Sequence, residues 1–413
     1  MCNAEKREKG SRGGGQGTRP SFGALHPSTP LVVTTKGPPV KTRWILCLML
    51  LAVTGSAHAQ LHPRPTKAPM IRALDPRFSG LVPESAEVEK IVEGHEWVEG
   101  PVWVRDGGYL LFSDVVKNAI YRWKEGEGEG VYLQPSGYTG TAPFAGAEPG
   151  SNGLAIDAAG RLVFARHGDR QIARLEPDGS TTVLVERYEG KRLNSPNDLV
   201  FHSSGDLYFT DPPFGLPGSY DDPAKELSHR GVYRLGRDGG LTLIAADLSA
   251  PNGIAFSPDE RTLYVSNADA RRLVWMAYDV HSSGTVGKVR VLFDGTKAFA
   301  GRRGTADGMK VDVHGNVFGV GPGGVYVISP KGTLLGWIDF AGNVGNVAWG
   351  EDGSTLFIAA NSAVYRVRLS TRGAGWQGQE NKDLGRSPRS GNKHADCCLA
   401  ELPRRDSNPR PGD

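Results

Sequence analysis

The sequence has no cysteine between residues 60 and 370. The four cysteines of the chain are Cys2, Cys47, Cys397 and Cys398. A domain without cysteine cannot form disulfides, so it depends on its hydrophobic core, and about 300 residues are enough to build one. The same absence excludes a zinc site of the cysteine-cluster type.

Three other signals are missing from the sequence. No window keeps the apolar period of an amphipathic helix. There is no G-x-S-x-G nucleophile elbow, which argues against a serine hydrolase. The apolar run at residues 44–53 is too short to span a bilayer. The sequence therefore favours an all-β protein without a membrane span.

The run "KTRWILCLMLLAVTGSAHAQ" (41–60) has the layout of a secretory signal. Lys41 and Arg43 form its basic part, the apolar run follows, and an A-x-A cleavage site ends at Ala59. We therefore predict a signal peptide over 41–59 and an exported mature protein, periplasmic or extracellular. Because such a signal belongs at an N-terminus, residues 1–40 are interpreted as a non-native or disordered extension from an upstream start.

The basic charge of the chain belongs to its ends. Of the formal net charge of +3, residues 1–59 contribute +6 and residues 371–413 contribute +2, which leaves −5 for residues 60–370. This mildly acidic span removes the charge argument for nucleic-acid binding. The polar segment 371–413, rich in Gly, Pro and Arg, is predicted to be a disordered tail. The folded domain is expected over 60–370.

Six segments of this domain repeat one pattern. Each opens with a polar or Gly/Pro element, continues with a short apolar strand and a Gly- or Asp-containing turn, and ends in alternating strands. The openings are "EGPVW" (from 99), "SNGL" (151), "SPNDLVF" (195), "PNGIAF" (251), "ADGMKV" (306) and "VGNVAW" (344). Repeats of about 40 to 55 residues built from short strands predict a β-propeller with one four-stranded blade per repeat. We therefore expect six blades, with the strand at 86–94 completing the last one.

The repeat openings place an oxygen-bearing side chain at an equivalent point in every blade. The innermost strand of a blade lines the central channel, so residues just before it converge on one mouth. The six side chains are those of Glu99, Asn152, Asn197, Asn252, Asp307 and Asn346. Each opening taken alone is an ordinary turn, but their agreement predicts a ring of oxygen donors. Two carboxylates and several amides suit a hard divalent cation such as Ca²⁺, with Mg²⁺, Mn²⁺ and Zn²⁺ as alternatives.

These openings, with "LYFTDPPFG" and "HRGVYRL", resemble the senescence marker protein (regucalcin)/gluconolactonase/luciferin-regenerating enzyme family over roughly residues 75–370. The resemblance implies a six-bladed propeller with a metal site at the channel mouth, which hydrolyses sugar lactones. Glu99, Asn252 and Asp307 match the metal ligands of that family, and Asn197 matches an asparagine that contacts metal or substrate. The chain departs from the family at Ala306, where relatives often have proline, and in "ARHGDR" around His167.

The resemblance and the ring together imply a role for each residue. Asp307 is the candidate base that takes a proton from water, and Glu99, Asn197 and Asn252 are expected to complete the metal site. Asn152, His167, Asn197 and Asn346 are expected to bind the substrate. His229 is interpreted as an exposed or capping residue, and the Pro-rich segment 211–223 as a lid or binding loop.

Alternative functions remain open from the sequence. The chain also resembles phosphoester hydrolases of the diisopropyl-fluorophosphatase type, which share a metal-centred propeller. A non-catalytic propeller in which the metal is purely structural is a second alternative. A strictosidine-synthase-like propeller is a third, and it would not need the oxygen ring. The expected partner is a small lactone, with no nucleic acid and no membrane after signal removal.

Overall fold

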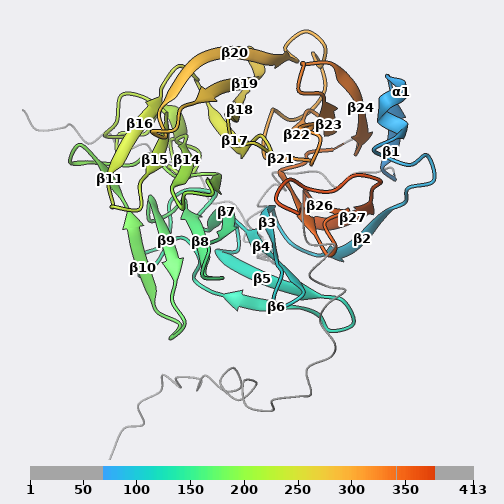
Figure 1. Ribbon diagram of the computed structural model, residues 1–413. Coiled ribbons are helices and arrows are strands. Elements are labelled where there is room, and N and C mark those ends of the chain that lie inside the picture. The colour runs from blue at the N-terminus through green and yellow to red at the C-terminus, as the bar shows by residue number, and fades with distance from the viewer. Residues whose placement is uncertain (1–67, 341, 377–413) are drawn as a thin grey trace, which may run out of the picture. The chain divides into compact units, whose positions relative to one another are not determined.

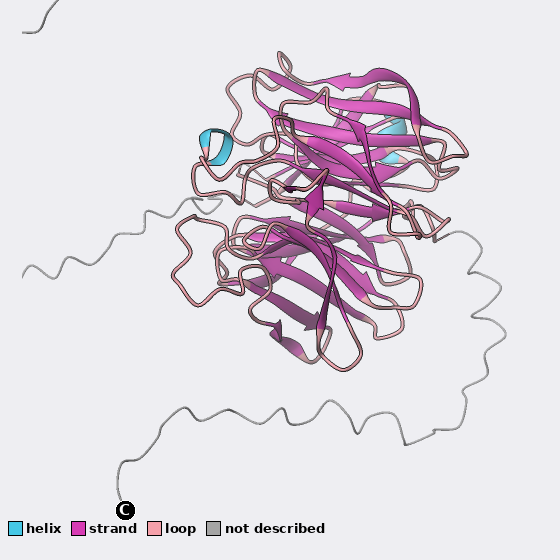
Figure 2. Ribbon diagram, turned by 90° about the vertical axis from the view of Figure 1, so that its left-hand side faces the viewer, coloured by secondary structure: helices cyan, strands magenta, loops and turns pink. Residues whose placement is uncertain are grey.

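The computed structural model describes residues 68–340 and 342–376. Strands of these residues form a six-bladed β-propeller (Figure 1). Among residues 68–340 and 342–376, helix is limited to short turns, as Figure 2 shows, namely α1 (Pro76–Ser79) and the 3₁₀ turn Ser219–Asp221. Within the described ranges, no helix is both long and apolar enough to cross a membrane. The all-β prediction and the blade number are confirmed.

Each blade is an antiparallel sheet whose first strand is the innermost. In the first three blades the strands follow chain order. Blade 1 consists of β3 (Val98–Val104), β4 (Tyr109–Asp114), β5 (Ala119–Lys124) and β6 (Gly128–Leu133), and blade 2 of β7 (Ser151–Ile156), β8 (Leu162–Arg166), β9 (Gln171–Leu175) and β10 (Thr181–Val185). Blade 3 consists of β13 (Leu199–Phe201), β14 (Leu207–Asp211), β15 (Gly231–Leu235) and β16 (Leu241–Ala245). A small hairpin, β11 (Arg187–Tyr188) and β12 (Lys191–Arg192), precedes the third blade.

The last three blades repeat this order. Blade 4 consists of β17 (Pro251–Phe256), β18 (Thr262–Asp269), β19 (Arg272–Val280) and β20 (Val286–Asp294), and blade 5 of β21 (Met309–Val311), β22 (Val317–Gly321), β23 (Gly324–Ile328) and β24 (Leu334–Asp339). Blade 6 contains β25 (Asn346–Gly350), β26 (Thr355–Ala360) and β27 (Ala363–Arg368). The segment predicted as signal peptide (41–59) and residues 377–413 of the predicted C-terminal tail lie outside the described residues. The first residues of that tail, 371–376, are described and pack on the propeller: Thr371 Oγ1 donates to Asp312 Oδ2 (3.0 Å), and Trp376 is buried in the core cluster of blades 5 and 6.

The N-terminal segment completes two blades. β2 (Val88–Glu93) pairs with β27, with Val88 opposite Val367, and so forms the outer strand of the sixth blade as predicted. β1 (Met70–Ala73) adds a fifth strand to blade 5 by pairing with β24, and this strand was not predicted from the sequence. Four mostly exposed residues give no alternation of apolar and polar side chains to detect. Between these strands, buried Phe78 packs into the core cluster that blades 5 and 6 share.

The core lies between neighbouring blades rather than at the centre of the ring. Blades 2 and 3, for example, bury Val163 of β8 against Phe209 of β14 and Tyr233 of β15 in one cluster. The Phe209 and Tyr233 rings stack with centroids 5.3 Å apart. Because apolar area is buried on both faces of each sheet, the ring is held by roughly additive contacts between blades. The inner strands are thereby fixed around the channel.

Candidate active site

The structure brings the six ring residues to one end of the channel. Each stands at the start of an innermost strand or directly before it, and successive members approach closely around the ring. The six are Glu99 (β3), Asn152 (β7), Asn197 (before β13), Asn252 (β17), Asp307 (before β21) and Asn346 (β25). All six inner strands run from this mouth towards the opposite end of the channel, since the sheets share one strand order. The predicted convergence is therefore present in the fold.

Glycines after the ring residues permit this close approach. A Cβ on Gly100 would lie 2.0 Å from the backbone oxygen of Asn152, and one on Gly253 would lie 2.3 Å from that of Asp307. Gly100 also has a φ of 52°, which side chains other than glycine rarely adopt. The glycine in "EGP" and "PNG" is thus the feature that lets adjacent inner strands meet at the mouth.

A hydroxyl on the second strand of three blades supports the ring residue of the next blade. Ser113 Oγ donates to the backbone oxygen of Asn152 (2.8 Å). Thr210 Oγ1 donates to that of Asn252 (2.6 Å) in the same way. Ser266 Oγ donates to the backbone oxygen of Asp307 (2.8 Å) and completes the set.

These hydroxyls were not predicted from the sequence, although the repeats carry a signal for them. "FSD" (112–114), "FTD" (209–211) and "VSN" (265–267) occupy equivalent positions at the ends of second strands. The final residue of each triplet caps the loop that enters its own blade. Asp114 accepts from the Glu96 N–H (3.0 Å), for example, and Asn267 Oδ1 accepts from the Ala250 N–H (2.8 Å). The loops that carry the ring residues are thus fixed from two sides.

Two further carboxylates reach the mouth and were not predicted. Asp198 is 1% exposed, and its Oδ2 accepts from Asn346 Nδ2 (3.4 Å), so blade 3 contacts blade 6. Glu148, on the loop between β6 and β7, has its Oε2 3.0 Å from Nδ1 of His167. Asp198 occupies the position where four other repeats have glycine, which is the one sequence signal that singles it out. Glu148 stands in no repeated position.

The four carboxylates create a strongly anionic site. Burial raises the pKa of Glu99 to about 8; a hydrogen bond from the Gly100 N–H opposes the rise, and the charges of Asp198 and Glu148 add to it. Burial also raises the pKa of Asp307 well above its usual value, and the charges of Glu99, Asp198 and Glu148 raise it further. Ionised together, these groups repel each other unless a cation compensates them.

The donor set fits a hard cation. Asn152 Oδ1 and Asn252 Oδ1 are buried, and neither has a hydrogen-bond partner among the described residues. A buried amide oxygen without a donor is costly, and a cation would satisfy it. No group of three His, Cys, Asp or Glu side chains in the described ranges forms a metal site by itself. A cation here would therefore need the amide oxygens as well as the carboxylates, as Ca²⁺ sites often do.

Two long loops lie at the mouth, because both follow strands that run towards it. In the 134–150 loop Tyr138 packs on Phe144 (5.1 Å between centroids). In the 212–230 loop Phe214 packs on Tyr220 (6.2 Å). A Cβ on Gly146 would come within 3.3 Å of Pro217, so the two loops touch. The segment predicted as a binding loop thus borders the ring.

His167, predicted to bind substrate, and His229, interpreted as an exposed or capping residue, differ in their surroundings. His167 has no exposed surface and contacts Glu148 and Asn197. His229 is half-buried, and its Nε2 lies 2.8 Å from the Tyr233 hydroxyl. His229 is thus a structural residue at the end of the 212–230 loop rather than a fully exposed one. His167 is the histidine that reaches the ring.

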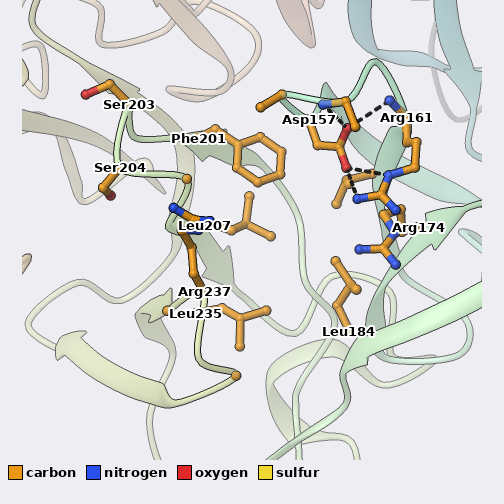
Figure 3. Close-up of a pocket in the computed structure, with 16 residues that line it drawn as sticks. Asp157, Arg161, Arg174, Leu184, Phe201, Ser203, Ser204, Leu207, Leu235 and Arg237 are labelled. Atoms are coloured by element: carbon orange, nitrogen blue, oxygen red, sulfur yellow. Dashed lines mark hydrogen bonds and ion pairs between the residues drawn. The ribbon is translucent and has the colours of Figure 1, made fainter.

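A separate cavity of about 560 Å³ lies where blades 2 and 3 face away from the mouth (Figure 3). It has an apolar lining that includes Phe201, and Arg161 and Arg174 border it. Arg161 pairs with Asp157 (2.8 Å) and Arg174 with Glu176 (2.6 Å). Two of the three arginines that line this cavity are therefore paired with carboxylates; the third is Arg237.

Comparison with known proteins agrees with this architecture. The sequence model of the SMP-30/Gluconolactonase/LRE-like region matches residues 97–362, which is more than half of the chain. The chain belongs to this family. Its relatives include a gluconolactonase of Zymomonas mobilis subsp. mobilis, which is 42% identical over 332 residues, covering 78% of this chain and 92% of the relative. A pentonolactonase of Haloferax volcanii is 25% identical and covers 63% of this chain and 80% of the relative.

Solved structures of family members share the fold. A gluconolactonase from Xanthomonas campestris superposes with a TM-score of 0.63 at 33% identity, covering 75% of this chain and 99% of the other. A calcium-binding regucalcin from Agrobacterium tumefaciens gives 0.55 at 19% identity, covering 70% and 95%, and shows the fold alone. The resemblance drawn from the repeat openings is thus confirmed.

Proposed function

We propose that this protein hydrolyses a sugar lactone with a divalent cation, Ca²⁺ being the first candidate, held by Glu99, Asn197, Asn252 and Asp307. The enzyme class rests on the 42% identity to a gluconolactonase over most of both chains, and it makes this chain a lactone hydrolase. The observation that supports a bound cation is that four carboxylates lie at the same mouth as two buried amide oxygens without hydrogen-bond donors. A bound cation would polarise the lactone carbonyl and lower the pKa of water.

Asp307 is the proposed general base. It is half-buried, so water can reach it, whereas Glu99 is 2% exposed. Burial and the charges of Glu99 and Asp198 raise the pKa of Asp307, which makes its ionised carboxylate a stronger base. A hydrogen bond from Asn252 orients the Asp307 carboxylate. In this assignment Glu99 holds the cation, and Asp307 takes the proton of the attacking water.

The substrate would enter between the two mouth loops. Asn152, Asn197 and Asn346 provide amide groups along the ring, and Tyr138 and Phe144 provide an apolar wall that suits the face of a sugar ring. His167 was also predicted to bind substrate. Because it has no exposed surface, direct contact would require the 212–230 loop to move.

The experiment is a hydrolysis assay of the purified protein on glucono- and pentonolactones after chelation and after return of Ca²⁺, Mg²⁺, Mn²⁺ or Zn²⁺. Lactone turnover that chelator abolishes and one cation restores is the expected result. Full turnover after exhaustive chelation would overturn the metal dependence. Turnover of phosphoesters but of no lactone would favour the diisopropyl-fluorophosphatase-like alternative, and metal binding with no turnover would favour a binding propeller.

We further propose that the mature protein is exported. The support is the signal-like run at 41–59 together with a domain free of cysteine, which needs no disulfide to fold outside the cytoplasm.

A further inference from the structure

We propose that Glu148 and His167 are positioning residues that fix the side-chain amide of Asn197 with its oxygen towards the channel mouth. The inference rests on the proposed function, because that oxygen is one of the proposed cation donors. Three contacts carry it: Glu148 to His167, His167 to Asn197, and the packing of the 212–230 loop on His167.

The hydrogen-bonding chemistry gives the chain of contacts a direction. Nδ2 of Asn197 lies 3.4 Å from Nε2 of His167, and an amide nitrogen can only donate. His167 Nε2 must therefore accept, which places the proton of a neutral imidazole on Nδ1. That nitrogen is buried and lies 3.0 Å from Glu148 Oε2, a close charge contact rather than an aligned hydrogen bond. Asn197 thus donates to His167, and the Nδ1 side of the His167 ring lies beside the Glu148 carboxylate.

Burial keeps His167 in this orientation. Its backbone N–H donates to the Gly150 oxygen (3.1 Å), which ties it to the loop that carries Glu148. On its other side a Cβ on Gly215 would lie 2.5 Å from His167 Cβ, so the backbone of the 212–230 loop packs directly against the histidine. A ring enclosed in this way cannot turn freely, and the acceptor it offers to Asn197 is fixed.

The consequence concerns Asn197. Its backbone is held on both sides, because its N–H donates to the Thr210 oxygen (2.9 Å) and its oxygen accepts from the Gly153 N–H (2.8 Å). The side chain can still exchange the places of its oxygen and nitrogen by rotation. Holding Nδ2 at His167 removes that freedom and leaves Oδ1 for a cation. Removing a residue that orients a metal ligand typically lowers metal affinity about 10- to 100-fold.

The first test measures Ca²⁺ affinity by titration calorimetry for His167→Leu and His167→Gln. His167→Leu removes the acceptor, and we expect its affinity to fall about 10- to 100-fold. His167→Gln offers an amide oxygen to Asn197, so it should recover most of the loss. His229→Leu is the matched control, since that histidine contacts Tyr233 instead of the ring. Unchanged affinity in folded His167→Leu, or equal loss in both His167 variants, would overturn the proposal.

The second test separates orientation from charge at Glu148. This side chain is 29% exposed, so its variants should fold. Glu148→Gln keeps an oxygen acceptor beside His167 but removes one negative charge from the mouth, so it should bind Ca²⁺ somewhat more weakly than the parent. Glu148→Ala also removes the acceptor and should bind more weakly still. An equal loss of Ca²⁺ affinity in Glu148→Gln and Glu148→Ala would mean that Glu148 acts through its charge alone, and would overturn its proposed role as a positioning residue.

A third measurement does not depend on a cation. In ¹⁵N NMR spectra of histidine-labelled protein, the resonances lost in His167→Gln should belong to a neutral ring protonated at Nδ1. Protonation at Nε2 would overturn the proposal. If the parent protein binds no Ca²⁺, Mg²⁺, Mn²⁺ or Zn²⁺, the proposal of a bound cation is wrong. The orientation of Asn197 by His167 is then decided by this spectrum alone.

Discussion

The buried carboxyl of Asp211 should make the stability of the protein depend on pH in an unusual direction. Asp211, at the end of β14, has no exposed surface. Its Oδ2 accepts from the Asn194 N–H (2.8 Å), but its Oδ1 is buried without a hydrogen-bond partner among the described residues. Burial raises the pKa of Asp211 to about 7, although the Asn194 N–H and the charge of Arg170 oppose the rise.

The magnitude follows from linkage. Between the usual pKa of 3.8 and the raised value, folded Asp211 keeps a proton that the unfolded chain has lost. The folded state therefore binds more protons, so stability is greatest below the usual pKa, falls as the pH rises, and levels off above about 7. At about 1.4 kcal/mol per pKa unit, the total loss is about 4 kcal/mol. About 3 kcal/mol of it falls between pH 5 and pH 8.

The assay is urea unfolding of the parent protein and Asp211→Asn across this pH range. The asparagine does not titrate and keeps an oxygen for the Asn194 N–H. The variant should therefore gain about 3 kcal/mol relative to the parent between pH 5 and pH 8. Asp259→Asn is the control, because a hydrogen bond from Ser257 lowers the pKa of Asp259. Replacing this carboxyl should therefore not increase stability relative to the parent between pH 5 and pH 8. A difference between Asp211→Asn and the parent that stays constant with pH would refute the reasoning.

Three other predictions concern the site, the core and processing. Asp307→Asn should lower kcat by roughly 10²-fold or more even with saturating metal, because it removes the proposed base. Excess metal should, by contrast, restore much of the activity of Asn252→Ala. The assay measures the lactonase rate of both variants against metal concentration. Full rescue of Asp307→Asn would reduce Asp307 to a ligand. Phe78→Ala should cost about 3 kcal/mol in urea unfolding, since the ring is buried between the N-terminal segment and blades 5 and 6; a loss below about 1 kcal/mol would mean that this segment is not part of the cooperative fold. N-terminal sequencing of exported protein should begin at Gln60, and a product that keeps residues 1–40 would contradict both the cleavage site and the extension.

The local pattern of the chain determined the architecture. Period-two alternation and Gly- or Asp-containing turns depend on neighbouring residues alone, so each blade can be recognised in the sequence. The pattern then recurs, and recurrence turns ambiguous turns such as "EGP" and "PNG" into equivalent positions around a channel. For that reason the six-bladed fold and the ring from Glu99 to Asn346 could be predicted. The closing strand β2 could be predicted as well, because a propeller needs its last blade completed.

The contacts between blades were decided by the tertiary structure. Asp198 meets Asn346 across 148 residues of sequence, and Glu148 meets His167 only because two loops fold over the same mouth. Neither Glu148 nor His167 has a counterpart in the other repeats, so comparing the repeats with one another could not detect them. β1 is likewise too short and too exposed to have a pattern of its own, and it becomes a strand because β24 offers a free edge. A repeated sequence specifies the features that every blade shares, whereas the closure of the ring determines which single side chains meet.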